Sequence, residues 1–352
     1  MGGSVGLKGT DGVMYGKALA MGAEPVSPAR TQEFLQHVNA DSIQFLVAPG
    51  PMGADHVAAA ELPYDVVGEV AGMPSADDTR AIAAAMLDAG VDLIAFAGGD
   101  GTARDIADAV DSQVPVVAVP SGVKVYSSVF AYSPRAAAEL LGAFVAGAEV
   151  AEEEVLDIDE EAYRAGRVDA RHYGFLLVPV VDRLVQAGKE ASGMGGSVAA
   201  AKQEIAKVIV DGMNSETLYL LGCGTTVRSI AEELGVDKAL LGVDAVLDGK
   251  LIGADLNEQS ILALLDAHER AEIIVTPLGG NGFIFGRGNK QFTPAVLRRV
   301  GCNNITIVAN RDKLLTLPCL HVDTGDSDLD EELAGYMDVI VGQSHRKLMR
   351  VE

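Results

Sequence analysis

The sequence predicts an α/β fold with two domains, and three observations support this prediction. Short apolar runs alternate with amphipathic helical segments along the first third of the chain. Two of these runs, 91–97 and 114–119, carry apolar residues at consecutive positions, which is typical of parallel strands buried on both faces. The 352 residues, 49% of them hydrophobic, are enough for two cores. We therefore expect a parallel-sheet first domain and a second, mixed α/β domain rich in strands.

The first domain is expected to contain three main helices between its strands. Ser27 and Pro28 have the pattern of an N-cap and a first-turn proline, and the helix they open runs to about residue 38. Ser75 is expected to cap the next helix, and a third helix covers 103–110. The predicted strands are 43–48, 64–70, 91–97 and 114–119.

The pattern changes after Pro120-Ser121-Gly122, and we place the domain boundary there, giving domains 1–122 and 123–352. A hairpin that turns at Asp248-Gly249 is expected over 242–255. The last predicted strand could return to the first domain, because sequence alone leaves its sheet open. The expected helices are 135–146, 199–211 and one that follows residue 226 and runs to 234, and the other strands are 173–179, 218–221, 273–276, 283–285, 305–308 and 339–341.

Composition excludes several classes of partner. With 50 acidic and 27 basic residues the formal net charge is −23, and such a field repels the phosphates of nucleic acids. An acidic surface of this kind is typical of high-salt habitats. The three cysteines form no CxxC pair, which favours a reducing compartment. No apolar run reaches the roughly 20 residues that span a bilayer. We expect a cytoplasmic protein with neither a nucleic-acid nor a membrane partner.

The strongest chemical signal is the segment Gly98-Gly99-Asp100-Gly101-Thr102, directly after the apolar run 91–97. Ligands of open α/β sheets bind at the carboxyl ends of strands. Glycines there let backbone N–H groups approach phosphate oxygens, and the following helix adds its positive end. Asp100 could hold Mg²⁺ or accept a hydroxyl proton. The segment fits neither a P-loop nor a GxGxxG motif, and we interpret it as a phosphate-binding loop.

Two other regions carry candidate cations. Lys8 and Asp11 lie in a Gly-flanked stretch near the start, where phosphate contact and an ordinary surface loop are equally good interpretations. Lys124 follows Ser121-Gly122 at a strand end, where a phosphate-facing cation is the favoured interpretation.

Two Gly-rich segments of the second domain complete the candidates. Gly224, Thr225 and Thr226 stand between a strand and a helix, so either an anion site or an N-cap by Thr225 explains them. Residues 279–290 combine many glycines with two cations in a very acidic chain, and we interpret them as a nucleotide phosphate or ribose contact. The candidates there are Gly280, Asn281, Arg287 and Asn289. Asp323 and Asp326 could hold Mg²⁺, but capping of the next helix is the preferred interpretation.

The Gly98–Thr102 segment matches the GGDGT signature shared by NAD kinases, diacylglycerol kinases and 6-phosphofructokinases. The wider chain resembles the ATP-NAD kinase family, in the branch that includes the acetoin-catabolism X proteins. The resemblance is carried over nearly the whole chain by Gly6-Leu7-Lys8-Gly9-Thr10-Asp11-Gly12, Ser121–Ser127, Gly222–Thr226, Leu241-Gly242-Val243-Asp244, Gly279–Phe283, Gly286-Arg287-Gly288-Asn289 and Val322–Asp326.

The resemblance implies a magnesium-dependent kinase that transfers the γ-phosphoryl group of ATP, or of polyphosphate, to the adenosine 2′-hydroxyl of NAD, giving NADP. Asp100 matches the family's catalytic aspartate. A homo-oligomer is also implied.

Three departures from the family pattern keep other functions open. NAD kinases usually begin with a strand and an Asn-Pro-x-x-Gly turn, whereas this sequence begins after that point. The Asn-Glu pair that usually follows GGDGT is absent there, and Asn257-Glu258 occurs in the wrong order. Residues 222–226 only loosely resemble the family's Thr-Pro-x-Gly-Ser-Thr-Ala loop. The alternatives are a kinase acting on a lipid, sugar or polyol hydroxyl, and a nucleotide-binding regulator without catalysis.

Overall fold

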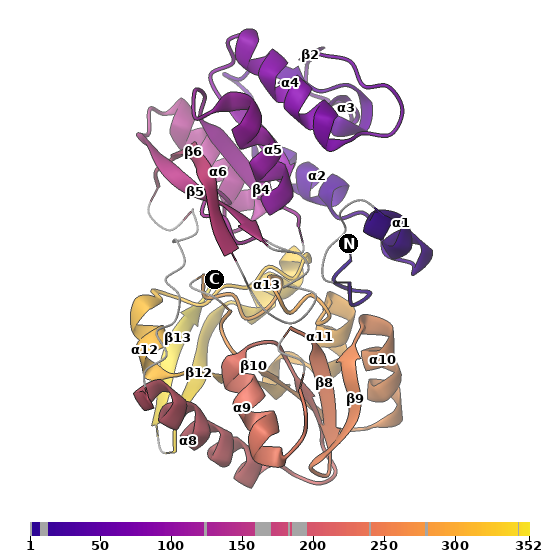
Figure 1. Ribbon diagram of the computed structural model, residues 1–352, viewed down its shortest axis with the longest axis vertical. Helices are drawn as coiled ribbons and strands as arrows, with labels where there is room; N and C mark the ends of the chain where they lie inside the picture. The colour runs from indigo at the N-terminus through magenta and orange to yellow at the C-terminus, as the bar shows by residue number, and fades with distance from the viewer. Residues whose placement is uncertain are drawn as a thin grey trace. The chain divides into compact units, whose positions relative to one another are not determined.

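The computed structural model describes residues 2–7, 13–122, 125–158, 170–181, 184, 196–238, 241–278, 281–343 and 345–352. It divides into two compact units, which we describe separately (Figure 1). The GGDGT unit contains Pro25–Glu160 and Val168–Gly188, and the seven-stranded unit contains Met1–Glu24 and Lys189–Glu352. No helix in the described part of the chain is both long and apolar enough to cross a membrane.

The GGDGT unit alternates helices with short strands, as predicted for its first half. Its elements are α2 (Ser27–His37), β1 (Phe45–Val47), η1 (Gly50–Met52), α3 (Ala54–Ala59), β2 (Tyr64–Val66), α4 (Ala76–Asp88), β3 (Ile94–Gly98), α5 (Asp100–Val110), β4 (Val116–Pro120), α6 (Pro134–Val145), β5 (Val150–Ile158) and β6 (Ala170–Pro179).

The strands of the GGDGT unit are parallel where the sequence predicts a parallel sheet, but they form two separate pairs. β1 pairs with β2, and β3 pairs with β4. β4 is covered on both faces: Val116 and Ala118 pack in a core with α5, and Val117 and Val119 pack in another with α2 and α6. The expected helix-covered parallel architecture is therefore present, with a break between β1 and β3.

Capping explains where two of these helices begin. Ser75 and Asp78 form a reciprocal capping box at the start of α4, which confirms the predicted N-cap. The predicted capping role of Ser27 is wrong, because Ser27 is already the first residue of α2 and the cap position is Val26. The Ser27 hydroxyl instead lies 2.9 Å from the Ser121 hydroxyl.

The seven-stranded unit is mixed α/β, as predicted for the second domain. Its sheet has the order β13-β12-β11-β10-β7-β8-β9, with β12, β11, β10 and β7 parallel and the remaining pairs antiparallel. Its elements are α1 (Val13–Ala20), α8 (Gly196–Gly212), β7 (Leu218–Leu221), α9 (Thr225–Leu234), β8 (Val243–Leu247), β9 (Lys250–Leu256), α10 (Glu258–Ala267), β10 (Ala271–Val275), α11 (Pro294–Val300), η2 (Cys302–Asn304), β11 (Ile305–Val308), α12 (Arg311–Thr316), α13 (Ser327–Leu333), β12 (Gly335–Gly342) and β13 (His345–Val351).

The side chains of this sheet alternate between two helical layers. Leu218 and Leu220 of β7 face a core shared with α10, α11 and α13, whereas Tyr219 and Leu221 face a core shared with α8 and α9. The predicted hairpin is confirmed, since Asp248 and Gly249 both have the positive φ of its tight turn. Residues 283–285 make only isolated bridges and not the expected strand.

The two units differ in extent from the predicted domains. The β5–β6 hairpin follows residue 122, yet Val155, Leu176 and Val178 pack in the same core as Ile106 of α5. The last strands, β12 and β13, extend the sheet from β11, so they do not return to the GGDGT unit.

Candidate functional site

In the GGDGT unit the motif lies at the carboxyl end of β3, the position expected for a ligand-binding loop. Gly98 ends β3, Gly99 is the N-cap of α5, and Asp100, Gly101 and Thr102 form the first turn of that helix. The helix starts three residues earlier than predicted, so Asp100 is held by helical backbone and not by a loose loop.

The close packing of the motif explains its first glycine. A Cβ on Gly98 would lie 2.5 Å from Cβ of Thr102, a distance that real side chains do not reach. The carbonyl oxygen of Gly98 accepts hydrogen bonds from the backbone N–H groups of Ser121 (2.9 Å) and Gly122 (3.0 Å). The segment after β4 is thereby joined to the GGDGT turn.

Asp100 is a buried carboxylate that accepts several hydrogen bonds from one loop. Its Oδ1 accepts from the Ser127 hydroxyl at 2.7 Å and the Ser127 N–H at 2.8 Å, and the Tyr126 N–H lies 2.9 Å from Oδ2. The Ser127 hydroxyl in turn accepts from the Leu156 N–H at 2.9 Å. These bonds stabilise the charged carboxylate and orient it.

The described contacts of Asp100 are relevant to the Mg²⁺ role that the sequence suggests for this carboxylate. Its described hydrogen-bond partners are N–H and O–H donors, whose hydrogens compete with a metal for the same lone pairs. No cluster of three potential metal ligands in the described part of the chain includes Asp100. Mg²⁺ also binds readily through phosphate groups and waters, with only one or two carboxylates.

In the seven-stranded unit, three segments distant in sequence come together. Asn289 Oδ1 accepts from the Cys223 N–H at 2.8 Å, and Asn289 Nδ2 donates to the Ile284 carbonyl at 2.9 Å. The Ile284 N–H donates to the His321 carbonyl at 3.0 Å. A Cβ on Gly286, whose φ is +93°, would collide with the carbonyl oxygen of Asp323. Asn289, which is fully buried, therefore acts as the central connector of these loops.

The N-terminal segment belongs to the same assembly of loops. The Ser4 carbonyl accepts from the Glu258 N–H at 3.0 Å, and Gly3 packs directly on the side chain of Lys290. Asn257 caps α10 by accepting from the Ser260 N–H at 2.9 Å. Asn257 therefore has a structural role at the start of α10.

Arg287 is buried beside this junction. Its guanidinium carbon lies 4.3 Å from the centre of the Phe283 ring. Burial, followed by the positive charge of Arg287, lowers the pKa of His321 to about 4, so this imidazole is neutral at pH 7. Asn281 is also buried. The region predicted to contact a nucleotide thus presents a cation and an amide in a tightly packed loop.

Two lysines that sequence reasoning missed flank the start of α9. Gly224 is its N-cap and has no capping side chain, and Thr225 and Thr226 form the first turn. Lys202 of α8 donates to the Thr225 hydroxyl at 2.9 Å. Lys313 of α12 donates to the carbonyl of Pro277, just after β10. Burial, followed by repulsion from Lys202, lowers the pKa of Lys313 to about 8.

The start of α9 gathers features that favour anion binding. Backbone N–H groups at a helix start bind anions, and two neighbouring amines raise the positive potential there in a protein of net charge −23. Of the two sequence interpretations, the N-cap by Thr225 is wrong because Gly224 occupies that position. The lysines carried no sequence signal: Lys202 looks like Lys207 on the same helix.

A buried ion pair lies in the Leu241–Asp244 region, which contacts the 222–226 loop. Lys238 Nζ lies 3.7 Å from Asp244 Oδ2, and both side chains are fully buried. Lys238 also donates to the Gly242 carbonyl at 2.8 Å, and Asp244 Oδ1 accepts from the Asp255 N–H at 2.7 Å. Cys223 Sγ lies 3.7 Å from the same Gly242 carbonyl. The Leu241–Asp244 motif therefore has a clear structural role.

The remaining predicted positions have separate outcomes. Lys8, Asp11, Lys124 and Gly280 lie outside the described residues. Asp326 caps α13 by accepting from the Leu329 N–H at 3.0 Å and pairs with Arg298 at 2.9 Å, which confirms the capping interpretation.

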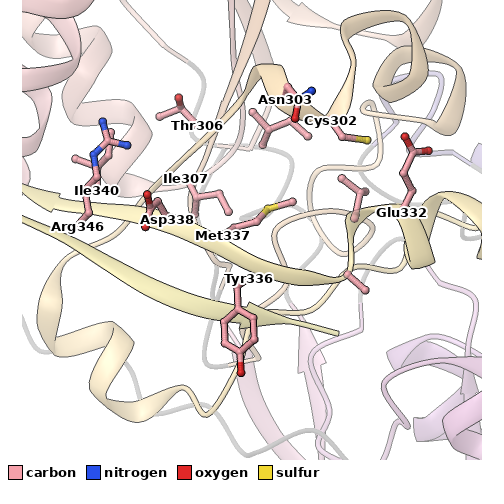
Figure 2. Close-up of a pocket in the computed structure, with 13 residues that line it drawn as sticks. Cys302, Asn303, Thr306, Ile307, Glu332, Tyr336, Met337, Asp338, Ile340 and Arg346 are labelled. Atoms are coloured by element: carbon pink, nitrogen blue, oxygen red, sulfur yellow. The ribbon is translucent and has the colours of Figure 1, made fainter.

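A cavity of about 320 Å³ lies elsewhere in the seven-stranded unit, on β11 and β12 (Figure 2). It is lined by Cys302 and Glu332 near one end and by Asp338 and Arg346 near the other. Burial, followed by the Glu332 carboxylate, raises the pKa of the Cys302 thiol, which disfavours the reactive thiolate. None of the predicted site residues lines this cavity, so we do not assign the site to it.

The fold and these loops define an α/β protein with Gly-rich turns between a strand and a helix in both units. Residues 22–149 match the ATP-NAD kinase N-terminal domain, and residues 214–351 match the ATP-NAD kinase C-terminal domain. The chain belongs to the ATP-NAD kinase family. The matches do not select the acetoin-catabolism branch. Comparison with curated proteins and with solved structures gives no match.

Proposed function

We propose that this protein is an NAD kinase that transfers the γ-phosphoryl group of Mg-ATP to the adenosine 2′-hydroxyl of NAD. The observation that carries the proposal is Asp100, buried and oriented by Ser127 and Tyr126 at the start of α5, in a chain matched by both ATP-NAD kinase domains. Phosphoryl transfer depends mainly on positioning and charge neutralisation, and such a site supplies positioning.

In the proposed step, Asp100 accepts the hydrogen of the 2′-hydroxyl while the hydroxyl oxygen bonds to the γ-phosphorus. The bond from the γ-phosphorus to the bridging oxygen breaks, and ADP leaves with that oxygen. Polyphosphate could replace ATP as donor by the same exchange, with a shortened polyphosphate leaving. Magnesium neutralises phosphate charge as part of the nucleotide substrate.

We assign phosphate binding in the seven-stranded unit to the start of α9, with Thr225, Lys202 and Lys313. The support is electrostatic, since this helix start combines backbone donors with two amines. Arg287, Asn281 and the loop that Asn289 holds are proposed to contact the nucleotide. These assignments are independent of the role of Asp100. If experiments contradict them, the proposed role of Asp100 is unaffected.

The first test is ADP release from Mg-ATP with and without NAD, at low and high salt, with NADP measured in parallel. We expect NAD-dependent ADP with equal NADP, and loss of both in Asp100→Ala. ADP formed with another hydroxyl acceptor but not with NAD would assign the same chemistry to a lipid, sugar or polyol. Nucleotide binding without turnover under any condition would instead identify a regulator.

A further inference from the structure

Three side chains with metal-binding atoms lie together in the seven-stranded unit, apart from the residues assigned to the kinase reaction. The Sγ atom of Cys319, a ring nitrogen of His321 and a carboxylate oxygen of Glu352 all lie within 4.8 Å of one another. Among the described residues this is the one group of three or more His, Cys, Asp and Glu side chains that are so close. The motifs discussed above do not account for such a group.

The backbone holds the three side chains on one side of a short parallel bridge. The Leu320 N–H donates to the Arg350 carbonyl at 2.7 Å, and the Glu352 N–H donates to the Leu320 carbonyl at 2.9 Å. Leu320 and Val351, which form the bridge, point into the core of the unit. Since side chains alternate along extended chain, their neighbours Cys319, His321 and Glu352 point to the opposite side.

The distance between the first two side chains fits a shared metal ion. Cys319 Sγ lies 3.5 Å from His321 Nε2. Tetrahedral zinc, with Zn–S of about 2.3 Å and Zn–N of about 2.0–2.1 Å, places sulfur and nitrogen about 3.5 Å apart. Only 5% of Cys319 and 6% of His321 is exposed, so both side chains are held in place by packing. Two ligands are thus positioned for one ion without rearrangement.

Glu352 supplies an anionic oxygen at the edge of the cluster. Its carboxylate lies 3.2 Å from the guanidinium of Arg350, and both side chains are partly exposed. An exposed pair of this kind is weak, so the carboxylate can turn toward a metal at little cost. Because Glu352 reaches solvent, a water molecule can occupy the fourth position of a tetrahedral ion.

The charges around the cluster favour a divalent ion with two anionic ligands. Arg287 lies close to His321, since its guanidinium carbon is 4.3 Å and the imidazole centre 5.3 Å from the centre of the Phe283 ring. A dipositive ion bound by a thiolate and a carboxylate has no net charge, so neither Arg287 nor Arg350 faces an uncompensated cation. A thiolate, an imidazole and a carboxylate together suit Zn²⁺ better than Mg²⁺ or Ca²⁺.

We propose that Cys319, His321 and Glu352 bind one zinc ion, with water as the fourth ligand. On binding, the sulfur of Cys319 bonds to zinc and the thiol proton passes to solvent. The ion links residue 352, next to the end of β13, to the segment whose His321 carbonyl accepts from the Ile284 N–H. The site is structural: it stabilises the seven-stranded unit and takes no part in phosphoryl transfer.

The test titrates the full chain, freed of metal by a chelator, with zinc alone in excess Mg²⁺, which occupies exposed carboxylates and binds thiolates poorly. Calorimetry should show one equivalent of zinc per chain. Cys319→Ser and His321→Gln should each weaken zinc binding by roughly a hundredfold or more, since loss of an outer-shell partner alone costs up to that much. Cys302→Ser is the matched control and should bind zinc like the unmodified protein.

Two further measurements do not depend on zinc affinity alone. Co²⁺ bound in place of zinc should give the absorption of a tetrahedral ion with a sulfur–cobalt charge-transfer band, and Cys319→Ser should lose that band. Zinc should raise the thermal unfolding temperature of the unmodified protein and of Cys302→Ser, but not of Cys319→Ser. Circular dichroism checks the fold. Glu352→Gln, at a partly exposed position, should remain folded and bind zinc at least roughly tenfold more weakly.

Three results would overturn the proposal. Equal zinc affinity in Cys319→Ser and Cys302→Ser would show that zinc binds elsewhere on this acidic surface. A cobalt spectrum without the sulfur band in the unmodified protein would show that Cys319 is not a ligand. Unchanged affinity in Glu352→Gln would exclude the three-ligand site. These experiments contain no nucleotide, so their outcome and that of the NAD-dependent turnover assay are independent.

Discussion

The Ser127 hydroxyl donates to Asp100 at 2.7 Å and accepts from the Leu156 N–H at 2.9 Å, which joins the start of α5 to β5 through one buried side chain. Ser127 therefore positions Asp100 without being an expected contact of substrate. The same bridge makes the candidate catalytic carboxylate dependent on a hairpin that lies beyond the predicted domain boundary.

Ser127→Ala is expected to lower kcat by roughly ten- to a hundredfold, because a charge-assisted hydrogen bond of about 1.5–3 kcal/mol is lost. NAD-dependent ADP release measures this effect, and circular dichroism checks the fold. Ser128→Ala is the matched control, since Ser128 donates to the Glu154 carbonyl from its backbone N–H, which alanine keeps. An unchanged kcat in Ser127→Ala would contradict the positioning role.

The proposed anion site at α9 predicts that nucleotide affinity depends on pH. The pKa of Lys313 is about 8 and its ordinary value is 10.5, so the amine is charged below pH 8 and loses its charge as the pH rises above it. ADP affinity, measured by calorimetry, should weaken between pH 7 and pH 9 in the unmodified protein. Lys313→Met should bind roughly ten- to a hundredfold more weakly at pH 7 and show a smaller change with pH.

Lys207→Met is the control for this site, because Lys207 lies exposed on the same helix as Lys202. Its ADP affinity should equal that of the unmodified protein at both pH values. Equal pH dependence of ADP affinity in Lys313→Met and Lys207→Met would show that Lys313 is not part of the site. The kinase proposal would be unaffected, because the turnover assay tests it separately.

The buried pair Lys238–Asp244 predicts a large loss of stability when one partner is neutralised. Asp244→Asn is expected to lower the free energy of unfolding by about 3–5 kcal/mol, because Lys238 is left buried without its counter-charge. The double variant Lys238→Met/Asp244→Leu should recover much of this loss. Urea denaturation measures both.

Asp248→Asn provides the comparison, since Asp248 and Lys250 form an exposed pair at 3.5 Å. Its effect should be below about 1 kcal/mol, and asparagine accepts the positive φ of this turn. Similar losses in Asp244→Asn and Asp248→Asn would show that the buried pair is not a special support of the 222–226 loop.

His321 predicts an acid-dependent loss of stability. Its folded pKa is about 4, below the ordinary 6.5, because of burial and the nearby Arg287; Cys319 and Glu352 also face it within 4.8 Å. The unfolded chain therefore binds more protons between pH 6.5 and 4, and stability falls as the pH falls through this window, by up to about 3 kcal/mol. Urea denaturation at pH 7 and pH 4.5 should show a smaller loss in His321→Gln.

Much of the fold could be predicted from local patterns. The Ser75 cap, the apolar run before Gly98 and the Asp248-Gly249 turn each depend on neighbouring residues, and each is found where the sequence predicts it. Ser27 shows the limit of such patterns, because a contact with Ser121, 94 residues away, competes for its hydroxyl.

The site could be predicted only in part. GGDGT, Arg287 and Asn289 are visible as unusual residues in Gly-rich segments, and the structure buries Asp100, Arg287 and Asn289. The assembly of the loops around Asn289 could not be predicted, because it depends on which strands are neighbours in the sheet. β7 is adjacent to β10, 50 residues later in sequence.

By itself, the sequence determined the α/β class, most helices and strands, the family resemblance and the GGDGT turn, because these depend on short-range propensities and on residue identity. Tertiary structure alone decided that Ser127 holds Asp100, that Lys202 and Lys313 lie near the start of α9, and that β1 and β3 belong to separate strand pairs. Those features depend on long-range packing, in which residues far apart in the chain exclude water from one another and so change hydrogen bonding, charge and burial together.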